Sequence, residues 1–228
     1  MAKYRWTVLI VICLLLAGLS AAAYAQAPGF IEKLPDVTRK YYATKPVLAK
    51  FEVGGFVVSF SLILADEPLH EWLDRRDPLP RDAWERISLL GNPLLHLALG
   101  FIGGLLESEV GEDLFYACLY NDLNTVVIKS STGMARPRLN QGVMFKGPTF
   151  TDDYAAMPSA HTSSSFAAAS VLGEHYPEWK PVLYLTATAV GLSRIFLDEH
   201  WPSNVALGAL AGYLSARHYL QVKEELEP

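Results

Sequence analysis

The chain has 228 residues, of which 51% are hydrophobic and 19% charged, and its formal net charge at pH 7 is −5. A net acidic chain without a basic tract argues against a nucleic-acid partner, because nucleic-acid-binding proteins present clustered Lys and Arg to phosphates. The length suits one domain with a substantial core, and no linker-like stretch separates a second domain.

Residues 1–25 are predicted to be a cleaved signal peptide. Lys3 and Arg5 precede a nearly unbroken apolar run over 7–19, and residues 23–25 read Ala-Tyr-Ala, a small-residue cleavage site. The apolar run is shorter than the ~20 residues of a membrane span, and an uncleaved anchor is the alternative. Cleavage removes two positive charges, which changes the net charge from −5 to about −7. We therefore expect an exported protein.

The residues after the signal peptide are predicted to form an arm and then one helical domain. The arm, 26–50, is polar and contains several prolines, so we expect it to be irregular or partly helical. Apolar residues at helical spacing dominate 51–228, where alternation with a period of two is hard to find. We interpret this region as an all-α bundle of about six core helices. These helices are predicted over 51–65, 87–105, 114–129, 163–172, 182–195 and 205–220.

Helix boundaries are predicted from prolines, glycines and capping residues. Pro68, Pro78 and Pro80 are expected to end the first helical region, Gly111 to separate the second predicted helix from the third, and Gly173 with Pro177 to end the fourth. Asp82 is expected to cap a helix, with Glu85 at the reciprocal position of a capping box.

The predicted helices favour a protein core over a lipid bilayer. Most offer only about 10 to 16 apolar residues, and only 87–105 approaches the length of a span. Asn121, Asp122 and Asn124 in the third predicted helix are costly in hydrocarbon unless they face the bundle interior. We expect a periplasmic or membrane-associated protein, with integral inner-membrane placement as the alternative.

The first chemical motif lies at the end of the third predicted helix. Lys129 closes that helix, and Arg136-Pro137 follows a turn of small residues. Because proline stops the helix, the guanidinium is held on a loop. A lysine point charge and an arginine fork are complementary ligands for phosphate oxygens. The alternative is a helix C-terminal charge and a solvated loop arginine.

The second motif is Pro-Ser-Ala-His at 158–161, directly before an Ala- and Ser-rich helix. Ser159 is expected to cap that helix, whose free N–H groups favour an anion. An imidazolium at His161 would then donate a proton to a leaving alkoxide. The alternative is a capping serine beside an incidental surface histidine.

The third motif joins the end of one predicted helix to the start of the next. Ser193-Arg194 is followed by His200, which can act as a nucleophile and form a phosphohistidine if one ring nitrogen faces phosphorus. The other ring nitrogen needs a partner that fixes the tautomer. Four residues later stands Asn204, whose oxygen is expected to accept that N–H.

These segments resemble the signature of the phosphatidic acid phosphatase type 2 / haloperoxidase superfamily, in its branch of exported acid phosphatases or lipid phosphatases. The family pattern is Lys-x6-Arg-Pro, Pro-Ser-x-His and Ser-Arg-x5-His-x3-Asp. It stands here as KSSTGMARP, PSAH and SRIFLDEHWPSN over 129–204, about a third of the chain. The resemblance implies a helical bundle with the phosphate site at helix ends, and a mechanism without metal or other cofactor.

The resemblance also implies a role for each matching residue. The phosphate would be bound by side chains from all three motifs, assisted by the backbone at the start of the helix after the second motif. One histidine would be the general acid and the other the nucleophile. The implied phosphate-binding residues are Lys129, Arg136, Ser159, Ala160 and Arg194; the implied catalytic residues are His161 and His200, with Asn204 at the position of the family's aspartate.

Two positions depart from the family pattern. Ala160 replaces the common glycine, a small change that a helical backbone should tolerate. Asn204 replaces the aspartate and supplies no charge to an imidazolium; in a serine-protease triad the same exchange costs about 10⁴ in turnover. Asp198 or Glu199 could substitute electrostatically, although we favour solvated acids for both.

The sequence therefore predicts a metal-independent phosphatase, a phosphoric monoester hydrolase. Its expected substrate is a phosphorylated small molecule, or a lipid-linked phosphate or diphosphate. The alternative is a catalytically weakened phosphate- or lipid-headgroup-binding protein, because of Asn204. Vanadate-dependent halide oxidation at the same site is disfavoured by the short chain. The motifs contact only the phosphate, so they specify neither the substrate nor the oligomeric state.

Overall fold

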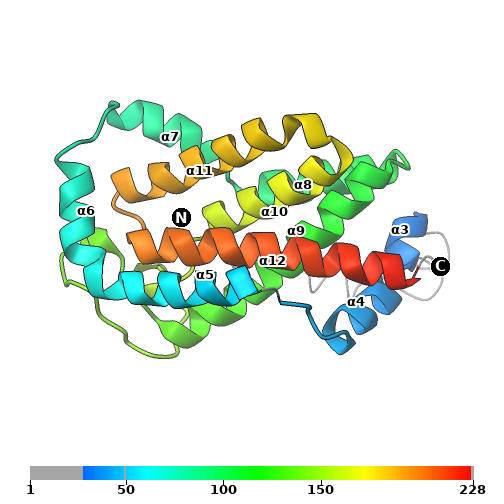
Figure 1. The fold of residues 1–228 in the computed structure, drawn as a ribbon, viewed down its shortest axis with the longest axis horizontal. Coiled ribbons are helices and arrows are strands. Elements are labelled where there is room, and N and C mark those ends of the chain that lie inside the picture. Colours follow the sequence, from blue (N-terminus) through cyan, green and yellow to red (C-terminus); the bar gives the residue numbers. More distant parts are fainter. Residues whose placement is uncertain (1–27, 49, 227–228) are drawn as a thin grey trace.

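The computed structural model describes residues 28–48 and 50–226, so the predicted signal peptide lies outside the described residues. Within them the chain forms helices joined by loops, and one isolated bridge pairs Met134 with Phe145 without any strand. The predicted all-α fold is confirmed (Figure 1).

Three long helices form the centre of the bundle. They are α9 (Glu109–Thr132), α10 (Ala160–His175) and α12 (Pro202–Leu226), and each packs against the other two (Figure 1). Close approach depends on glycine: a Cβ at Gly212 of α12 would collide with the backbone of Ser163 on α10. The two longest of them, α9 and α12, run along most of the bundle, and the shorter α10 lies between them (Figure 1).

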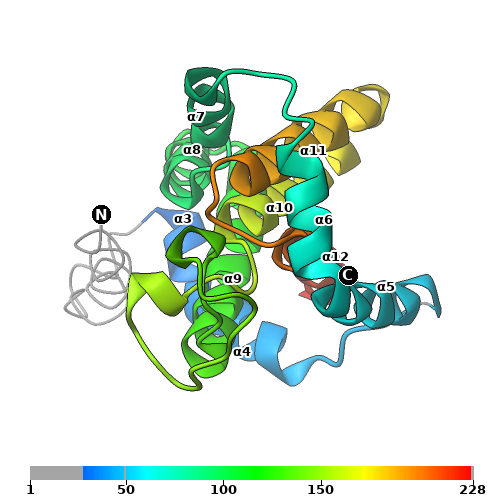
Figure 2. The same cartoon turned by 90° about the vertical axis from the view of Figure 1, so that its left-hand side faces the viewer.

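The remaining helices cover this centre. On the three central helices, α8 (Pro93–Leu105) packs on α9, α11 (Lys180–Phe196) on α10, and α5 (Lys50–Ser61) on α12. The short helix α7 (Arg81–Leu89) lies against α11, and α6 (Asp66–Asp74) crosses one end of the bundle (Figures 1 and 2). The 3-10 turn η1 (Leu62–Ala65) joins α5 to α6.

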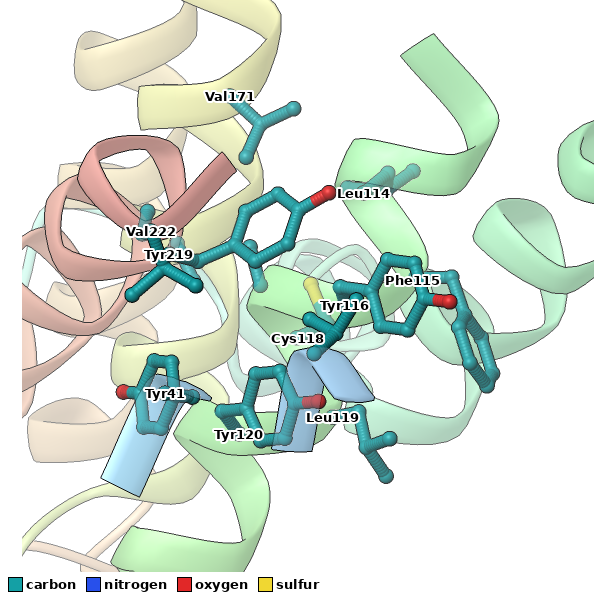
Figure 3. Close-up of a cluster of buried hydrophobic side chains, with 14 of the residues drawn as sticks. Tyr41, Leu114, Phe115, Tyr116, Cys118, Leu119, Tyr120, Val171, Tyr219 and Val222 are labelled. Carbon is teal, nitrogen blue, oxygen red and sulfur yellow. The ribbon is translucent and has the colours of Figure 1, made fainter. Parts of the chain in front are cut away.

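The arm predicted over 26–50 is mostly helical where it is described and belongs to the core. It forms α3 (Gly29–Glu32) and α4 (Leu34–Ala43), whose apolar side chains are buried. Tyr41 stacks on Tyr120 of α9 with ring centroids 4.2 Å apart, in a cluster that also holds Tyr219 of α12 (Figure 3). The polar composition of the arm did not indicate that it is buried, because a few well-spaced apolar residues are enough to form one buried helix face.

Several predicted boundaries are wrong. Pro68 lies inside the first turn of α6, where proline is tolerated, so helical structure continues past it to Asp74 and ends before Pro78 and Pro80. Gly111 lies in the first turn of α9 and packs against α8, while Ser108 caps α9. Asp82 makes no capping bond, because α7 begins directly after Pro80. The helix predicted over 87–105 is divided at Asn92, whose side chain accepts from the Leu94 N–H and caps α8.

Two helical segments are long and apolar enough to cross a membrane, Glu52–Asp74 and Arg81–Leu105. The first was predicted as a shorter helix. Only 11% and 28% of their most apolar windows are buried in the molecule. Large apolar side chains therefore face outward, such as Val57 at 62% and Leu64 at 90% exposure. An apolar surface of this kind marks a protein or membrane contact.

Candidate active site

The three motif segments meet at one end of the bundle. The last turns of α9 and α11 and the first turns of α10 and α12 lie there, next to α6 (Figures 1 and 2). Arg136 Nη1 lies 3.4 Å from His200 Nε2. The positive charges of Lys129, Arg136 and Arg194 act on both His161 and His200. We call these three basic residues the cation cluster.

A left-handed turn places the first two members of the cation cluster. Gly133 has φ 59° and ends α9, and a Cβ there would collide with the Gly147 carbonyl. Lys129 is buried in the last turns of α9, where its Nζ donates to the Ala155 carbonyl at 2.6 Å. Beyond the turn, Arg136 enters the site from a loop, as the Arg-Pro pair predicts.

His200 is held in one orientation and one tautomer. Its ring is 2% exposed, and Nδ1 lies 2.6 Å from the Ala156 carbonyl. A carbonyl oxygen can only accept, so Nδ1 carries the proton and Nε2 keeps its lone pair. That lone pair faces Arg136, in the direction from which an anion would approach.

His161 lies in the first turn of α10, directly after the helix cap. The Ser159 hydroxyl accepts from the Thr162 N–H at 3.4 Å, which confirms the predicted N-cap. Burial, followed by the charges of the cation cluster, holds the pKa of His161 well below its usual range. The same causes lower the pKa of His200, so both rings are neutral at pH 7.

Arg136 is surrounded by carboxylates and carbonyl groups. Its Nε donates to the Asp152 carbonyl at 2.9 Å, and its Nη2 to Asp152 Oδ1 at 3.0 Å. Its Nη1 donates to Glu199 Oε2 at 2.6 Å and to the Glu199 carbonyl at 3.1 Å. The expectation that Glu199 is a solvated acid is therefore wrong, because its side chain lies inside the site.

Arg194 is less completely bonded than Arg136. Its Nη1 donates to Ser88 Oγ at 2.5 Å, whereas its buried Nε has no hydrogen-bond partner among the described residues. Burial, opposed by the Glu199 carboxylate, lowers the pKa of Arg194 to about 10, so it stays charged at pH 7. A buried, charged donor without a partner is costly in a structural cluster and suits an anion-binding site.

Asn204 does not accept the hydrogen bond from the His200 ring N–H, as was predicted. The Ala156 carbonyl accepts it instead. The Asn204 side-chain oxygen accepts instead from the Trp201 N–H at 3.0 Å, and its amide donates to Met134 Sδ at 3.1 Å. Its backbone carbonyl accepts from the Ser159 N–H at 3.0 Å, which ties the second and third motifs together.

Four residues near the cation cluster were not predicted from the sequence as part of the site: Ser88, Arg138, Asp152 and Glu199. Arg138 lies two positions after Arg136, and its Nη2 lies 2.9 Å from Asp153 Oδ1 and 3.2 Å from Asp152 Oδ2. The Arg-Pro-Arg spacing was the only available signal for Arg138.

The predicted phosphate-binding residue Ala160 begins α10 in helical conformation, consistent with the expected tolerance of its Cβ.

No three His, Cys, Asp or Glu side chains within residues 28–48 and 50–226 are grouped so that they could hold a metal ion. The chemistry available at this end of the bundle is that of fixed cations, one oriented imidazole and a second imidazole on a helix start. Such a set can bind a tetrahedral oxyanion, attack it and move a proton.

A sequence model of the PAP2 superfamily matches residues 113–227. The chain is similar to a lipid A 1-phosphatase of Rhizobium johnstonii, at 26% identity over 125 residues, 54% of this chain and 51% of the relative. It is also similar to a lipid A 1-phosphatase of Porphyromonas gingivalis, at 33% over 97 residues, 39% of this chain and 22% of the relative. It thus spans about half the length, or less, of the curated relatives it matches.

The fold is similar to that in the crystal structure of Aquifex aeolicus LpxE. The TM-score is 0.58 at 23% identity, and the match covers 69% of this chain and 95% of that chain. At this identity the likeness concerns the fold alone.

Proposed function

The chain belongs to the PAP2 superfamily, and from this premise we propose that it is a phosphatase that hydrolyses a lipid-borne phosphomonoester through a phosphohistidine intermediate. One observation carries the proposal: His200 has its Nδ1 proton fixed on the Ala156 carbonyl and its Nε2 lone pair directed towards Arg136. This is the geometry that a nucleophilic imidazole needs.

In the first half of the reaction, His200 Nε2 attacks phosphorus. The bond between phosphorus and the leaving oxygen breaks as the P–N bond forms. The cation cluster binds the phosphoryl oxygens and stabilises the charge that develops on them. The Ala156 carbonyl stabilises the resulting positive ring through the Nδ1 proton, in place of the family's carboxylate.

His161 moves the proton in both halves. An arriving phosphate brings negative charge beside the ring and opposes the cations that keep its pKa low, so that the ring can be protonated in the complex. His161 then donates its proton to the leaving oxygen. In the second half it takes a proton from water as the water attacks phosphorus, the P–N bond breaks and Nε2 is restored.

The apolar outer surface favours a lipid substrate at a membrane. The two span-length segments contain most of α5 and all of α8, and the exposed side chains of these two helices are largely Val, Leu and Ile. Burying such a surface in a bilayer is favourable at roughly 25 cal/mol per Å². The relatives named above act on lipid A, a phosphorylated lipid by its name. We propose membrane association with the site at the level of the lipid headgroups.

Phosphate release by the purified chain in detergent tests the proposal. The substrates are phosphatidic acid, lipid A, an isoprenyl diphosphate and the soluble ester p-nitrophenyl phosphate, each with and without EDTA. We expect release from a lipid monoester that EDTA does not reduce and vanadate inhibits. Absence of release from every lipid, with release from the soluble ester, would contradict a lipid substrate.

The second candidate is a weakened phosphate-binding protein, favoured by the absence of a carboxylate at Asn204. It predicts that the chain binds phosphate but turns over none of the substrates. Trapping of a ³²P-labelled, acid-labile and base-stable phosphoenzyme separates the two candidates, because only the enzyme passes through a P–N bond.

A further inference from the structure

We propose that the Glu199 carboxylate is an internal occupant of the phosphate position, and that a doubly charged phosphate displaces it more readily than a singly charged diester does. This inference rests on the proposed function and deepens it. It makes Glu199 a built-in competitor, which an anion must displace before it binds the cation cluster.

The position of Glu199 Oε2 carries the inference. That single oxygen lies 2.6 Å from Arg136 Nη1, 3.6 Å from Arg138 Nε and 3.8 Å from Arg194 Nη2. Three guanidinium groups from two separate segments therefore converge on one carboxylate oxygen. A phosphoryl oxygen is the ligand for which such a convergence is suited.

The carboxylate lies on the side of the nucleophile from which phosphorus must approach. Arg136 Nη1 is shared between Glu199 Oε2 at 2.6 Å and His200 Nε2 at 3.4 Å. The opposite ring nitrogen is already bonded to the Ala156 carbonyl. Glu199 is therefore not the missing partner of the His200 N–H; instead it shares Arg136 Nη1 with the nitrogen that would attack phosphorus.

The Glu199 side chain can leave while its backbone stays. Its N–H donates to the Arg194 carbonyl at 3.1 Å, and its own carbonyl accepts from Arg136, so the main chain is fixed on both sides. The side chain is 27% exposed and borders a cavity of about 680 Å³, whose lining includes Arg81 and Arg138 but also the carboxylates of Glu67, Glu71, Asp74 and Asp198. Rotation about side-chain bonds would carry the carboxylate into this cavity.

Charge then decides which ligand displaces Glu199. A phosphomonoester carries nearly two negative charges at neutral pH, whereas a diester carries one. The electrostatic attraction between a phosphate dianion and the cation cluster is stronger than the attraction that is lost when the Glu199 carboxylate leaves. A phosphate monoanion carries the same single charge as the carboxylate, so its binding gains little electrostatic energy over the carboxylate.

Calorimetric titration of the full chain in detergent micelles at about pH 8 tests this inference. The probes are inorganic phosphate, predominantly a dianion there, and dimethyl phosphate, a monoanion. We expect Glu199→Gln to tighten phosphate binding about tenfold, the equivalent of one charged hydrogen bond, and dimethyl phosphate binding by about the same factor, because the cost of displacing the carboxylate does not depend on the ligand. Asp153→Asn is the matched control; it removes a carboxylate from Arg138 at 2.9 Å and should change either constant less than about twofold.

Phosphate binding that is unchanged or weaker in a folded Glu199→Gln protein would overturn the inference, since it would mean that Glu199 only holds Arg136 in place. A gain for only one of the two probes would also overturn it, and so would wild-type binding of dimethyl phosphate that is as tight as that of phosphate. If Glu199→Gln does not fold, Glu199→Asp, with a shorter side chain, should show the same tightening. If the Glu199→Gln protein binds phosphate more tightly but neither it nor the wild type hydrolyses any substrate, the proposed function is overturned while this inference stands.

Discussion

The two ends of the bundle both hold buried charges, but they treat them differently. At the far end from the site, Asp113 on α9 is 1% exposed. Its carboxylate accepts from Tyr219 at 2.8 Å, from Lys223 at 2.9 Å and from His175 at 2.8 Å. Tyr219 and Lys223 come from α12 and His175 from α10, so one carboxylate joins all three central helices. We call these four residues the Asp113 network.

The cation cluster shows the opposite pattern. Its charges come from loops and helix ends, Arg194 Nε has no hydrogen-bond partner among the described residues, and Arg136 is bonded to the carboxylates of Asp152 and Glu199. The Asp113 network satisfies its central group from within the fold. In this molecule the completely bonded charge joins the central helices, whereas the incompletely bonded one lies at the proposed phosphate site.

The largest expected difference between the two ends is the effect on turnover of replacing a histidine by alanine. His200→Ala should reduce kcat/KM at least about 10⁴-fold, because it removes the nucleophile and with it the covalent step. His175→Ala in the Asp113 network should change kcat/KM less than about twofold. Both are measured as phosphate release from the best lipid substrate. Comparable losses in the two variants would show that the ends are not functionally distinct.

Asp113→Asn should have the reverse profile. It leaves Lys223 half-buried with only Glu109 as an anionic partner, so the free energy of unfolding should fall by about 2–3 kcal/mol. The midpoint of denaturant unfolding in detergent measures this, with the exposed Asp36→Asn as a control. We expect kcat/KM at permissive temperature to stay within about twofold; a large loss would assign the Asp113 network a role in turnover.

The smallest expected effect concerns Asn204. Since the Ala156 carbonyl already holds the His200 N–H, Asn204→Asp should change kcat less than about tenfold. The new carboxylate keeps the acceptor for the Trp201 N–H but buries a charge beside Met134, so we also expect a lower unfolding midpoint. A rise in kcat by orders of magnitude would instead support the weakened-protein alternative.

The sequence predicted the all-α class and the motifs that meet at the site, because both depend on local patterns. Helical apolar spacing shows the class, and Ser159 caps the helix that follows it by contacts within three residues. The Arg-Pro pair likewise predicts a loop arginine. Each of these inferences needs only a short segment of chain.

The contacts between segments could not be predicted in this way. Whether Glu199 faces solvent or Arg136 depends on how the loop before α12 folds against the loop after α9, 63 residues away in sequence. The partner of the His200 N–H is a backbone carbonyl, and every residue type carries one. The prediction of an irregular or partly helical arm was incomplete for a related reason: the burial of the arm depends on its packing against α9 and α12 rather than on its composition.

Two neighbouring carbonyl groups hold two buried groups of the site. Ala155 binds Lys129 and Ala156 binds His200, so a single peptide unit sets the spacing between the proposed phosphate ligand and the proposed nucleophile. The loop 140–150 is bonded to the end of α9 and to the turn after it through the Met144 carbonyl and the N–H groups of Lys146 and Thr149, so changes in its length that keep these bonds leave the spacing unchanged. Its first residues, 140–142, are therefore where the protein can be lengthened, shortened or diversified towards new leaving groups while this geometry is inherited intact.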